Sequence, residues 1–338
     1  MKILITGGCG FVGSNVALKL DQEHEVYCLD NFSKLESKLN EGLIQKRGIP
    51  VIKGSISDKK FINDLIEDLK PDCLIHLAAQ VAMTYSIEDP QNDFDINLLG
   101  TFNLINAINN FSKKTEFINI STNKVYGDLA WDEITESETR FSSIQNNEGY
   151  DENTPLSFSG PYGSSKGSAE QYVLDYNKTF NLKTTSLRLS TIYGPNQHST
   201  YNQGWIGWFL QQVNENKHKE LIEVPVHGNG KQVRDILFID DFSELIVLLI
   251  NNFSKINGEV FNIGGSLKNS LSIIELLQKS QDLFELKSEF KIHEKEWRPA
   301  DQKFYVSNIN KINNKLQWFP KTDIDVGLES FASWLQEK

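Results

Sequence analysis

Cysteine is scarce in this sequence, with three residues among 338. Cys9, Cys28 and Cys73 fall in or beside predicted apolar strands, and they show neither the spacing of a metal site nor a disulfide framework. We therefore expect reduced thiols, no bound metal ion and a cytoplasmic setting.

Positive charge and long apolar runs are also in short supply. Lysine and arginine total 34 against 45 aspartate and glutamate residues, and the net charge of −11 argues against nucleic acid or an anionic membrane as the main partner. No apolar run approaches the length of a membrane span. The chain passes from Met1 almost directly into an apolar strand, so we expect no signal peptide. A small anionic ligand is still expected where arginines gather.

The first motif is a glycine-rich loop between a strand and a helix. Lys2–Thr6 is a short apolar strand, residues 7–13 read GGCGFVG, and a helical pattern follows through Leu20. Glycines let the backbone approach a pyrophosphate, whose charge is stabilised by the N–H groups that begin the helix. A glycine loop alone is weak evidence, but one placed between a strand and a helix predicts dinucleotide binding. The candidate contacts in this loop are Gly7, Gly10, Phe11, Val12 and Gly13.

An acidic residue ends the next predicted strand. Asp30 follows residues 25–29 and lies 17 residues after Gly13. A carboxylate at this place accepts hydrogen bonds from the hydroxyls of an adenosine ribose and repels a 2′-phosphate, which favours NAD over NADP. The alternative is an aspartate that merely keeps a strand end soluble.

Apolar strands and helical segments alternate through the first 190 residues. This rhythm predicts an α/β fold with a Rossmann-type doubly wound parallel sheet. The further strands are expected at residues 50–53, 72–77, 116–120 and 184–189.

The composition changes after the last of these strands, and no repeat or low-complexity linker marks a boundary. We expect residues 1–185, with about 235–258, to form the cofactor-binding domain. Residues 186–234 and 259–338 would form a smaller interleaved C-terminal substrate domain. Segment 128–160 is acidic and has no clear period, and we expect it to be an ordered flap near the site.

The candidate catalytic pair is Tyr162 and Lys166. Of the 10 tyrosines, only Tyr162 has a lysine four residues later, and on a helix that spacing puts both side chains on one face. The lysine charge is expected to lower the tyrosine pKa from about 10 towards neutrality, so that the phenolate can take a proton from a sugar hydroxyl. The alternative is an ordinary exposed helix face. Thr122, which ends the apolar strand at 116–120 together with Ser121, favours the catalytic interpretation.

Together these motifs resemble the extended short-chain dehydrogenase/reductases of the nucleotide-sugar epimerase and dehydratase group. The resemblance extends over essentially the whole chain. It rests on TGGCGFVGSN, LDN, HLAAQ, the ST before VYG, YGSSK, RLSTIYGP, GNGKQVRD and RPADQ.

The resemblance implies a tightly held NAD that oxidises one sugar carbon transiently and returns the hydride to the opposite face. Tyr162 would be the base and acid, Lys166 would set its pKa and anchor the cofactor ribose, and Thr122 would hydrogen-bond the reacting oxygen. Further cofactor contacts are expected at Asn31, Ser33, Ser55, Ile56, Leu77, Ala78, Ala79, Gln80, Asn97, Ser121 and Ser190. Contacts to the nucleotide sugar are expected at Asn123, Thr191, Gln203, Gly204 and the diphosphate-binding Arg234 and Arg298.

One replacement in the motifs limits the choice of reaction. In the resembling 4,6-dehydratases an Asp-Glu pair directly follows the threonine, whereas this sequence has Asn123 and Lys124, which cannot supply the extra acid and base that dehydration needs. Epimerisation through a ketone needs only tyrosine, lysine, a hydroxyl and NAD.

Ser55 replaces an aspartate that contacts adenine in many relatives, which would loosen cofactor binding slightly.

Several possibilities stay open at this point. The motifs do not say which sugar carbon is inverted, and an epimerase acting at C4 or on a UDP- or GDP-sugar fits them as well. A non-catalytic NAD-binding protein is a further alternative, against which the complete Thr122, Tyr162 and Lys166 set argues. We also expect a homo-oligomer, either a dimer or a tetramer.

Overall fold

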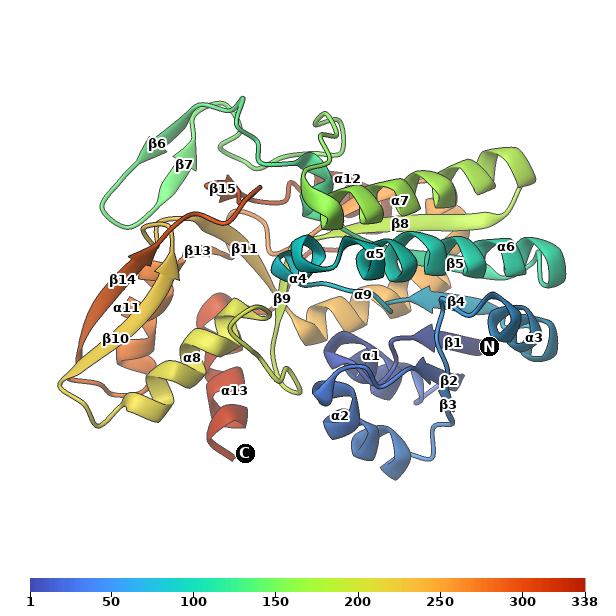
Figure 1. Cartoon of the computed structure of the whole chain (residues 1–338), viewed down its shortest axis with the longest axis horizontal. Helices are drawn as coiled ribbons and strands as arrows, with labels where there is room; N and C mark the ends of the chain where they lie inside the picture. The colour runs from blue at the N-terminus through green and yellow to red at the C-terminus, as the bar shows by residue number, and fades with distance from the viewer. Residues whose placement is uncertain (338) are drawn as a thin grey trace.

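A computed structural model describes residues 1–337 of the chain, and its centre is a seven-stranded parallel sheet (Figure 1). From one edge to the other the strands are β12 (Val260–Ile263), β8 (Lys183–Leu189), β5 (Glu116–Thr122), β4 (Cys73–His76), β1 (Lys2–Thr6), β2 (Glu25–Asp30) and β3 (Val51–Lys53). The strand order reverses between β1 and β4. Ligands of doubly wound sheets bind at such a switch point, beyond the carboxyl ends of the strands.

Helices cover both faces of this sheet. The strands are apolar on both sides, as parallel strands buried between two helix layers must be. Ile3 and Ile5 of β1 pack with α1 (Phe11–Leu20), α2 (Leu35–Lys46), α9 (Ile239–Asn251) and α12 (Asn310–Leu316). Leu4 packs on the opposite side with α3 (Lys59–Leu69), α6 (Thr101–Phe111) and α7 (Gly160–Phe180). The Rossmann-type fold expected from the sequence is confirmed.

A smaller lobe contains the remaining strands. One sheet joins β13 (Ser270–Ser272), β11 (Val233–Phe238), β15 (Phe304–Tyr305) and β9 (Thr191–Tyr193), and a second pairs β10 (Leu221–His227) with β14 (Glu289–Lys295). These strands pack on α8 (Trp205–Asn216), α11 (Ile273–Leu283) and α13 (Ile324–Glu337) around a second apolar core. The lobes interleave because β11 leads directly into α9, beneath the central sheet (Figure 1).

One strand belongs elsewhere than we expected. The predicted division placed residues 259–338 in the smaller domain, whereas β12 pairs with β8 and completes the central sheet. Its apolar residues Phe261 and Ile263 are fully buried there, in the core shared with α9. The rest of the domain division stays a prediction.

The irregular segment 128–160 also differs from expectation. It is ordered, with a hairpin of β6 (Ile134–Glu136) and β7 (Phe141–Ser143), but none of its residues lines the central cavity. Backbone hydrogen bonds hold it to the smaller lobe, from Phe141 N to Lys231 O at 2.9 Å and from Tyr150 N to Val306 O at 2.8 Å. The segment therefore packs along the smaller lobe and is not a flap over the site.

Shorter helices complete the chain. They are α4 (Met83–Glu88), α5 (Pro90–Asp93), a π-helical stretch (Phe94–Gly100), a 3₁₀ turn (Asn123–Tyr126) and α10 (Phe253–Ile256). From Pro90 to Phe111 the chain is continuously helical, from α5 through the π-helical stretch into α6. None of the helices within residues 1–337 has the length and apolarity to cross a bilayer. All three cysteines are buried and free, and burial raises the pKa of each thiol.

Candidate active site

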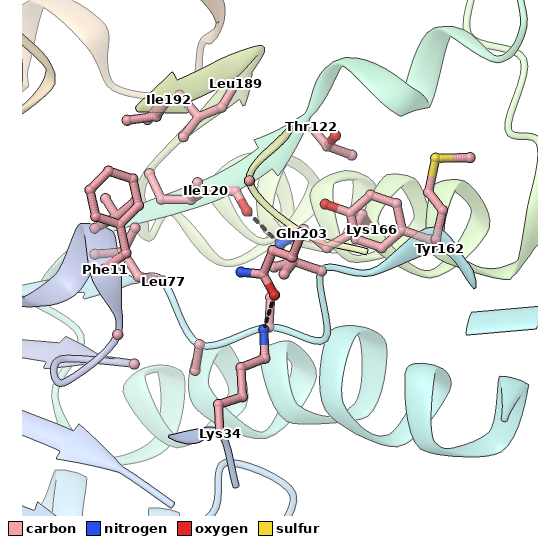
Figure 2. Close-up of a pocket in the computed structure, with 18 of the residues that line it drawn as sticks. Phe11, Lys34, Leu77, Ile120, Thr122, Tyr162, Lys166, Leu189, Ile192 and Gln203 are labelled. Carbon is pink, nitrogen blue, oxygen red and sulfur yellow. Dashed lines mark hydrogen bonds between the residues drawn. The ribbon is translucent and has the colours of Figure 1, made fainter. Parts of the chain in front are cut away.

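A cavity of about 480 Å³ opens at the carboxyl ends of the central strands and extends to the smaller lobe. Figure 2 shows part of its lining, from Phe11 of α1 past Leu77 to Tyr162 and Lys166 of α7. Of the predicted site residues, those that line it are Gly7, Gly10, Phe11, Val12, Gly13, Asp30, Asn31, Ser33, Ser55, Ile56, Leu77, Ala78, Ala79, Ser121, Thr122, Asn123, Tyr162, Lys166, Ser190, Thr191, Gln203, Gly204, Arg234 and Arg298. Segments far apart in sequence thus form one site.

The glycine loop is shaped for close backbone approach. Gly7 has φ +68°, and a Cβ there would lie 2.8 Å from Ala78 N, so only glycine fits. A Cβ on Gly13 would lie 2.1 Å from Gly7 O, which explains the tight packing of α1 against the loop. A Cβ on Gly10 would have only Gly7 O nearby, at 3.3 Å, and no side chain caps α1. The residues that begin α1 line the cavity and their N–H groups are not capped by a side chain, and such a donor set suits a pyrophosphate.

Asp30 is held rigidly at the same end of the cavity. The N–H groups of Cys9 and Phe32 donate to its carboxylate at 3.1 and 2.9 Å, and the side chain of Ser37 donates at 3.4 Å. The residue is only 7% exposed. A surface aspartate that merely aids solubility would be exposed, so the burial of this carboxylate argues against that alternative and fits the position expected for an acceptor of ribose hydroxyls.

Gln80 and Asn97 support the site from behind and do not line the cavity. The Asn97 side chain accepts from Gln80 N at 2.9 Å and donates to Gln80 O at 3.0 Å. Both amides also donate to the buried carboxylate of Asp93, which accepts as well from the hydroxyl of Ser165. Their side chains are fully used within the protein, so the expected direct contacts to the cofactor are not supported by this geometry.

Tyr162 and Lys166 begin α7 side by side, with Thr122 opposite them at the end of β5 (Figure 2). Pro161 occupies the first turn of the helix, as its fixed φ favours. The Lys166 ammonium donates to Ile120 O, and burial lowers its pKa to about 8, so at pH 7 the group is still mainly charged. The spacing therefore places the three groups as the sequence predicted.

The expected pKa of Tyr162 was wrong for the protein alone. Burial raises the pKa of the phenol to about 12, a hydrogen bond with Thr122 lowers it in part, and the negative charge of Asp93 raises it further. The spacing of YxxxK predicts proximity but takes no account of desolvation, which here outweighs the opposing effects. A positive charge close to the phenol, as a bound oxidised nicotinamide carries, would favour the phenolate.

The other end of the cavity is basic. Arg234 comes from β11 and Arg298 from the loop after β14, and both line the cavity. Arg234 Nη2 donates to Asp301 Oδ1 at 2.7 Å. Lys124 Nζ forms an ion pair with the same oxygen, Asp301 Oδ1, at 3.4 Å, and Lys124 also lines the cavity. We missed Lys124 and Asp301 as site residues. The position of Lys124 two residues after Thr122 was the available signal.

A third missed residue is Lys34, just before α2. Its ammonium donates to Oε1 of Gln203, which lies 169 residues later, at 2.8 Å (Figure 2). This bond ties the cofactor side of the cavity to the loop that precedes α8. Gln203 is therefore placed at the cavity, as predicted, but its amide oxygen is engaged by a protein group.

Comparison with known proteins supports this description. The model of a family described as GDP-mannose 4,6 dehydratase matches residues 4–331. CDP-paratose 2-epimerase of Salmonella typhi is 42% identical over 336 residues, which cover 99% of each chain. The structure of a UDP-glucose 4-epimerase from Thermotoga maritima with UDP-glucose has a TM-score of 0.83 and 27% identity, covering 100% of this chain and 99% of its own.

A dTDP-glucose 4,6-dehydratase from Bacillus anthracis, solved in complex with NAD, has a TM-score of 0.80 and 26% identity, covering 100% of this chain and 97% of its own. Epimerases and dehydratases thus share this architecture. The chain belongs to the GDP-mannose 4,6 dehydratase family, within the short-chain dehydrogenase/reductase group of nucleotide-sugar epimerases and dehydratases that its motifs resemble.

Proposed function

We propose that this protein is an NAD-dependent nucleotide-sugar epimerase that inverts C2 of CDP-paratose to CDP-tyvelose through a transient 2-keto sugar. The observation that carries the reaction type is the cavity itself. It brings Thr122, Tyr162 and Lys166 together. Asn123 and Lys124 also line it, at the positions where the dehydratases have their extra acid and base. The choice of C2 and of a CDP-sugar rests on the 42% identity to CDP-paratose 2-epimerase.

The cofactor end of the cavity fits NAD. The loop at residues 7–13 would hold the pyrophosphate, Asp30 the adenosine ribose and Lys166 the nicotinamide ribose. Neighbouring structures were solved with NAD. When bound, NAD supplies the reversible two-electron acceptor that lets a sugar carbinol become a ketone.

The chain's own groups handle the proton. Tyr162 takes it from the sugar hydroxyl and later returns it, and Thr122 hydrogen-bonds the same oxygen. The Lys166 charge favours the phenolate form of Tyr162, which is the form that takes the proton and is regenerated when the proton is returned. Asn123 does no acid–base work, because an amide does not titrate near neutral pH, and its side chain is held by a hydrogen bond that it donates to Gln302 Oε1 at 3.0 Å.

The proposal predicts complete retention of the substrate C2 hydrogen. Inversion through a ketone returns that hydrogen to the same carbon, whereas inversion through a carbanion exchanges it with solvent. We expect the product formed in D₂O to carry no deuterium at C2, measured by NMR with CDP-, UDP- and GDP-sugars in parallel. Deuterium at C2 would overturn the mechanism. Retention with inversion at C4 of a UDP-sugar would instead favour the second candidate, to which the Thermotoga maritima enzyme is a structural neighbour.

The cofactor proposal makes a separate prediction. Because the Asp30 carboxylate would meet a 2′-phosphate, the purified protein should release NAD or NADH on denaturation, and no NADP. Mass spectrometry of the released nucleotide tests this. The Asp30→Ser variant should discriminate less between the two cofactors. Asp58→Ser is its control, because Asp58 caps α3 outside the cavity and serine keeps that capping role. Release of NADP from the unchanged protein would contradict the assignment.

A further inference from the structure

Lys124 is a buried cation that the proposed reaction does not use. It lies two residues after Thr122, which ends β5, in the 3₁₀ turn Asn123–Tyr126. Its side chain lines the cavity and is only 13% exposed. Burying an ammonium group is costly unless something opposite in charge lies close. The question is therefore what balances this charge.

The single carboxylate available to Lys124 is already shared. Asp301 Oδ1 receives Arg234 Nη2 at 2.7 Å, the backbone N–H of Gln302 at 3.1 Å and Lys124 Nζ at 3.4 Å. Within residues 1–337, no other carboxylate forms an ion pair with Lys124 or Arg234. One negative charge cannot balance both cations, so the pair with Asp301 does not account for Lys124.

Arg298 adds a third cation to this group. Its positive charge is close enough to lower the pKa of both Asp301 and Lys124. Its Nε is buried and has no hydrogen-bond partner within residues 1–337, and Nη2 donates only a long 3.4 Å bond to Tyr201 O. Three cations around one carboxylate leave two positive charges unbalanced, together with a buried guanidinium N–H that has no partner within residues 1–337. A ligand that carries two negative charges would complete the set.

We propose that Lys124 is a third phosphate-binding residue, acting with Arg234 and Arg298 on the diphosphate of the nucleotide sugar, and that Asp301 orients Lys124 and Arg234 for it. The proposal rests on the proposed function, which supplies a nucleoside diphosphate as the ligand class. It also explains why a lysine stands at the position of the glutamate in the Asp-Glu pair of the dehydratases. The same position here contributes binding to the phosphates and not chemistry on the sugar.

Protonation supports the assignment. Burial, opposed by Asp301 and reinforced by Arg234 and Arg298, lowers the pKa of Lys124 to about 8. An added dianion raises the pKa of a neighbouring ammonium, so binding above pH 8 should take up a proton at Lys124. Lys166 and Tyr162 line the same cavity, with pKa values near 8 and 12. Any uptake at those residues would persist when Lys124 is replaced.

The test is calorimetric titration of the NAD-loaded protein with CDP, which needs no turnover. At pH 7 we expect Lys124→Met to weaken CDP binding about 10-fold or more, as loss of a hydrogen bond to a charged group would. At pH 8.5, in buffers of different ionisation enthalpy, the wild type should take up protons and Lys124→Met should take up fewer. Lys124→Arg, which is always charged, should restore affinity without restoring the uptake.

Lys231→Met is the control, because Lys231 pairs with Glu136 outside the cavity and should leave both measurements unchanged. Equal affinity and equal proton uptake in Lys124→Met and the wild type would refute the role of Lys124. If the wild type binds UDP or GDP in place of CDP, the nucleotide in the proposed function is wrong. The affinities of the variants relative to the wild type are then measured with that nucleotide, and they test the role of Lys124 in the same way.

Discussion

Replacing Tyr162 with phenylalanine should lower kcat by about 100-fold or more, because positioned proton transfer contributes roughly 10²–10⁴ to such reactions. The hydroxyl of Tyr162 faces Thr122 across the cavity, and among the lining residues no other phenol or imidazole is available to replace it. The ring itself remains in the variant, so packing at the start of α7 and the NAD content should change little. Initial rates with the CDP-sugar, together with the released NAD and a thermal melt, measure all three quantities.

Ser164→Ala on the exposed side of the same helix turn is the matched control for Tyr162→Phe. It should keep wild-type kcat. A Tyr162→Phe enzyme with wild-type turnover would remove the phenol from the mechanism. A variant that lost NAD as well as activity would show that the hydroxyl has a structural role which the geometry does not reveal.

Replacing Glu170 with glutamine should destabilise the protein by about 3–5 kcal/mol, the usual cost of leaving a buried charge without its partner. Glu170 on α7 is fully buried, and Arg188 of β8 donates to it from Nε at 3.1 Å and from Nη2 at 2.6 Å. Arg188 also donates to the hydroxyl of Tyr126 at 2.8 Å, which extends the network. Glutamine keeps the volume but leaves the guanidinium charge uncompensated.

Denaturant unfolding measures this loss, with Asp64→Asn as the control. Asp64 pairs with Lys60 on the exposed face of α3, where solvent screens the interaction, so its removal should have little effect. Because the charge of Glu170 raises the pKa of Lys166, the Glu170→Gln variant should also hold Lys166 less fully protonated at pH 8. Equal midpoints for Glu170→Gln and Asp64→Asn would contradict the importance of the buried pair.

Six of the seven strands of the central sheet were predictable, because each is a short run of apolar residues next to a helix signal. The glycine loop and Asp30 were predictable for the same reason, since strand, loop and helix follow one another in the chain. The position of β12 was not predictable, because its four residues could pair with any exposed strand edge, and the choice of β8 is made by long-range packing. The position of segment 128–160 was not predictable either, because it is set by hydrogen bonds to Lys231 and Val306, which are far away in sequence.

The site divides in the same way. Residues that belong to local motifs, such as Tyr162 and Lys166, line the cavity as expected. Gln80 and Asn97 belong to motifs too, but the buried Asp93 occupies their amides, and nothing in the local sequence marks that carboxylate. The meeting of Lys124 with Asp301 joins positions 177 residues apart. Desolvation of the Tyr162 phenol depends on the residues that bury it, which come together only in three dimensions.

The placement of β12 has a consequence for how the chain acquires its structure during synthesis. The cofactor-binding sheet lacks its seventh strand until residues 260–263 have left the ribosome, long after β8 is complete. Until then β8 is an edge strand with unpaired backbone groups, and such edges attract strands from other chains. Closing the sheet also requires bringing together segments about 75 residues apart, as the pairing of Val260 with Ser186 shows, which slows folding. During this interval the edge of β8 is the place where the nascent lobe is open to pairing with strands of other chains, and the pairing of β12 covers that edge.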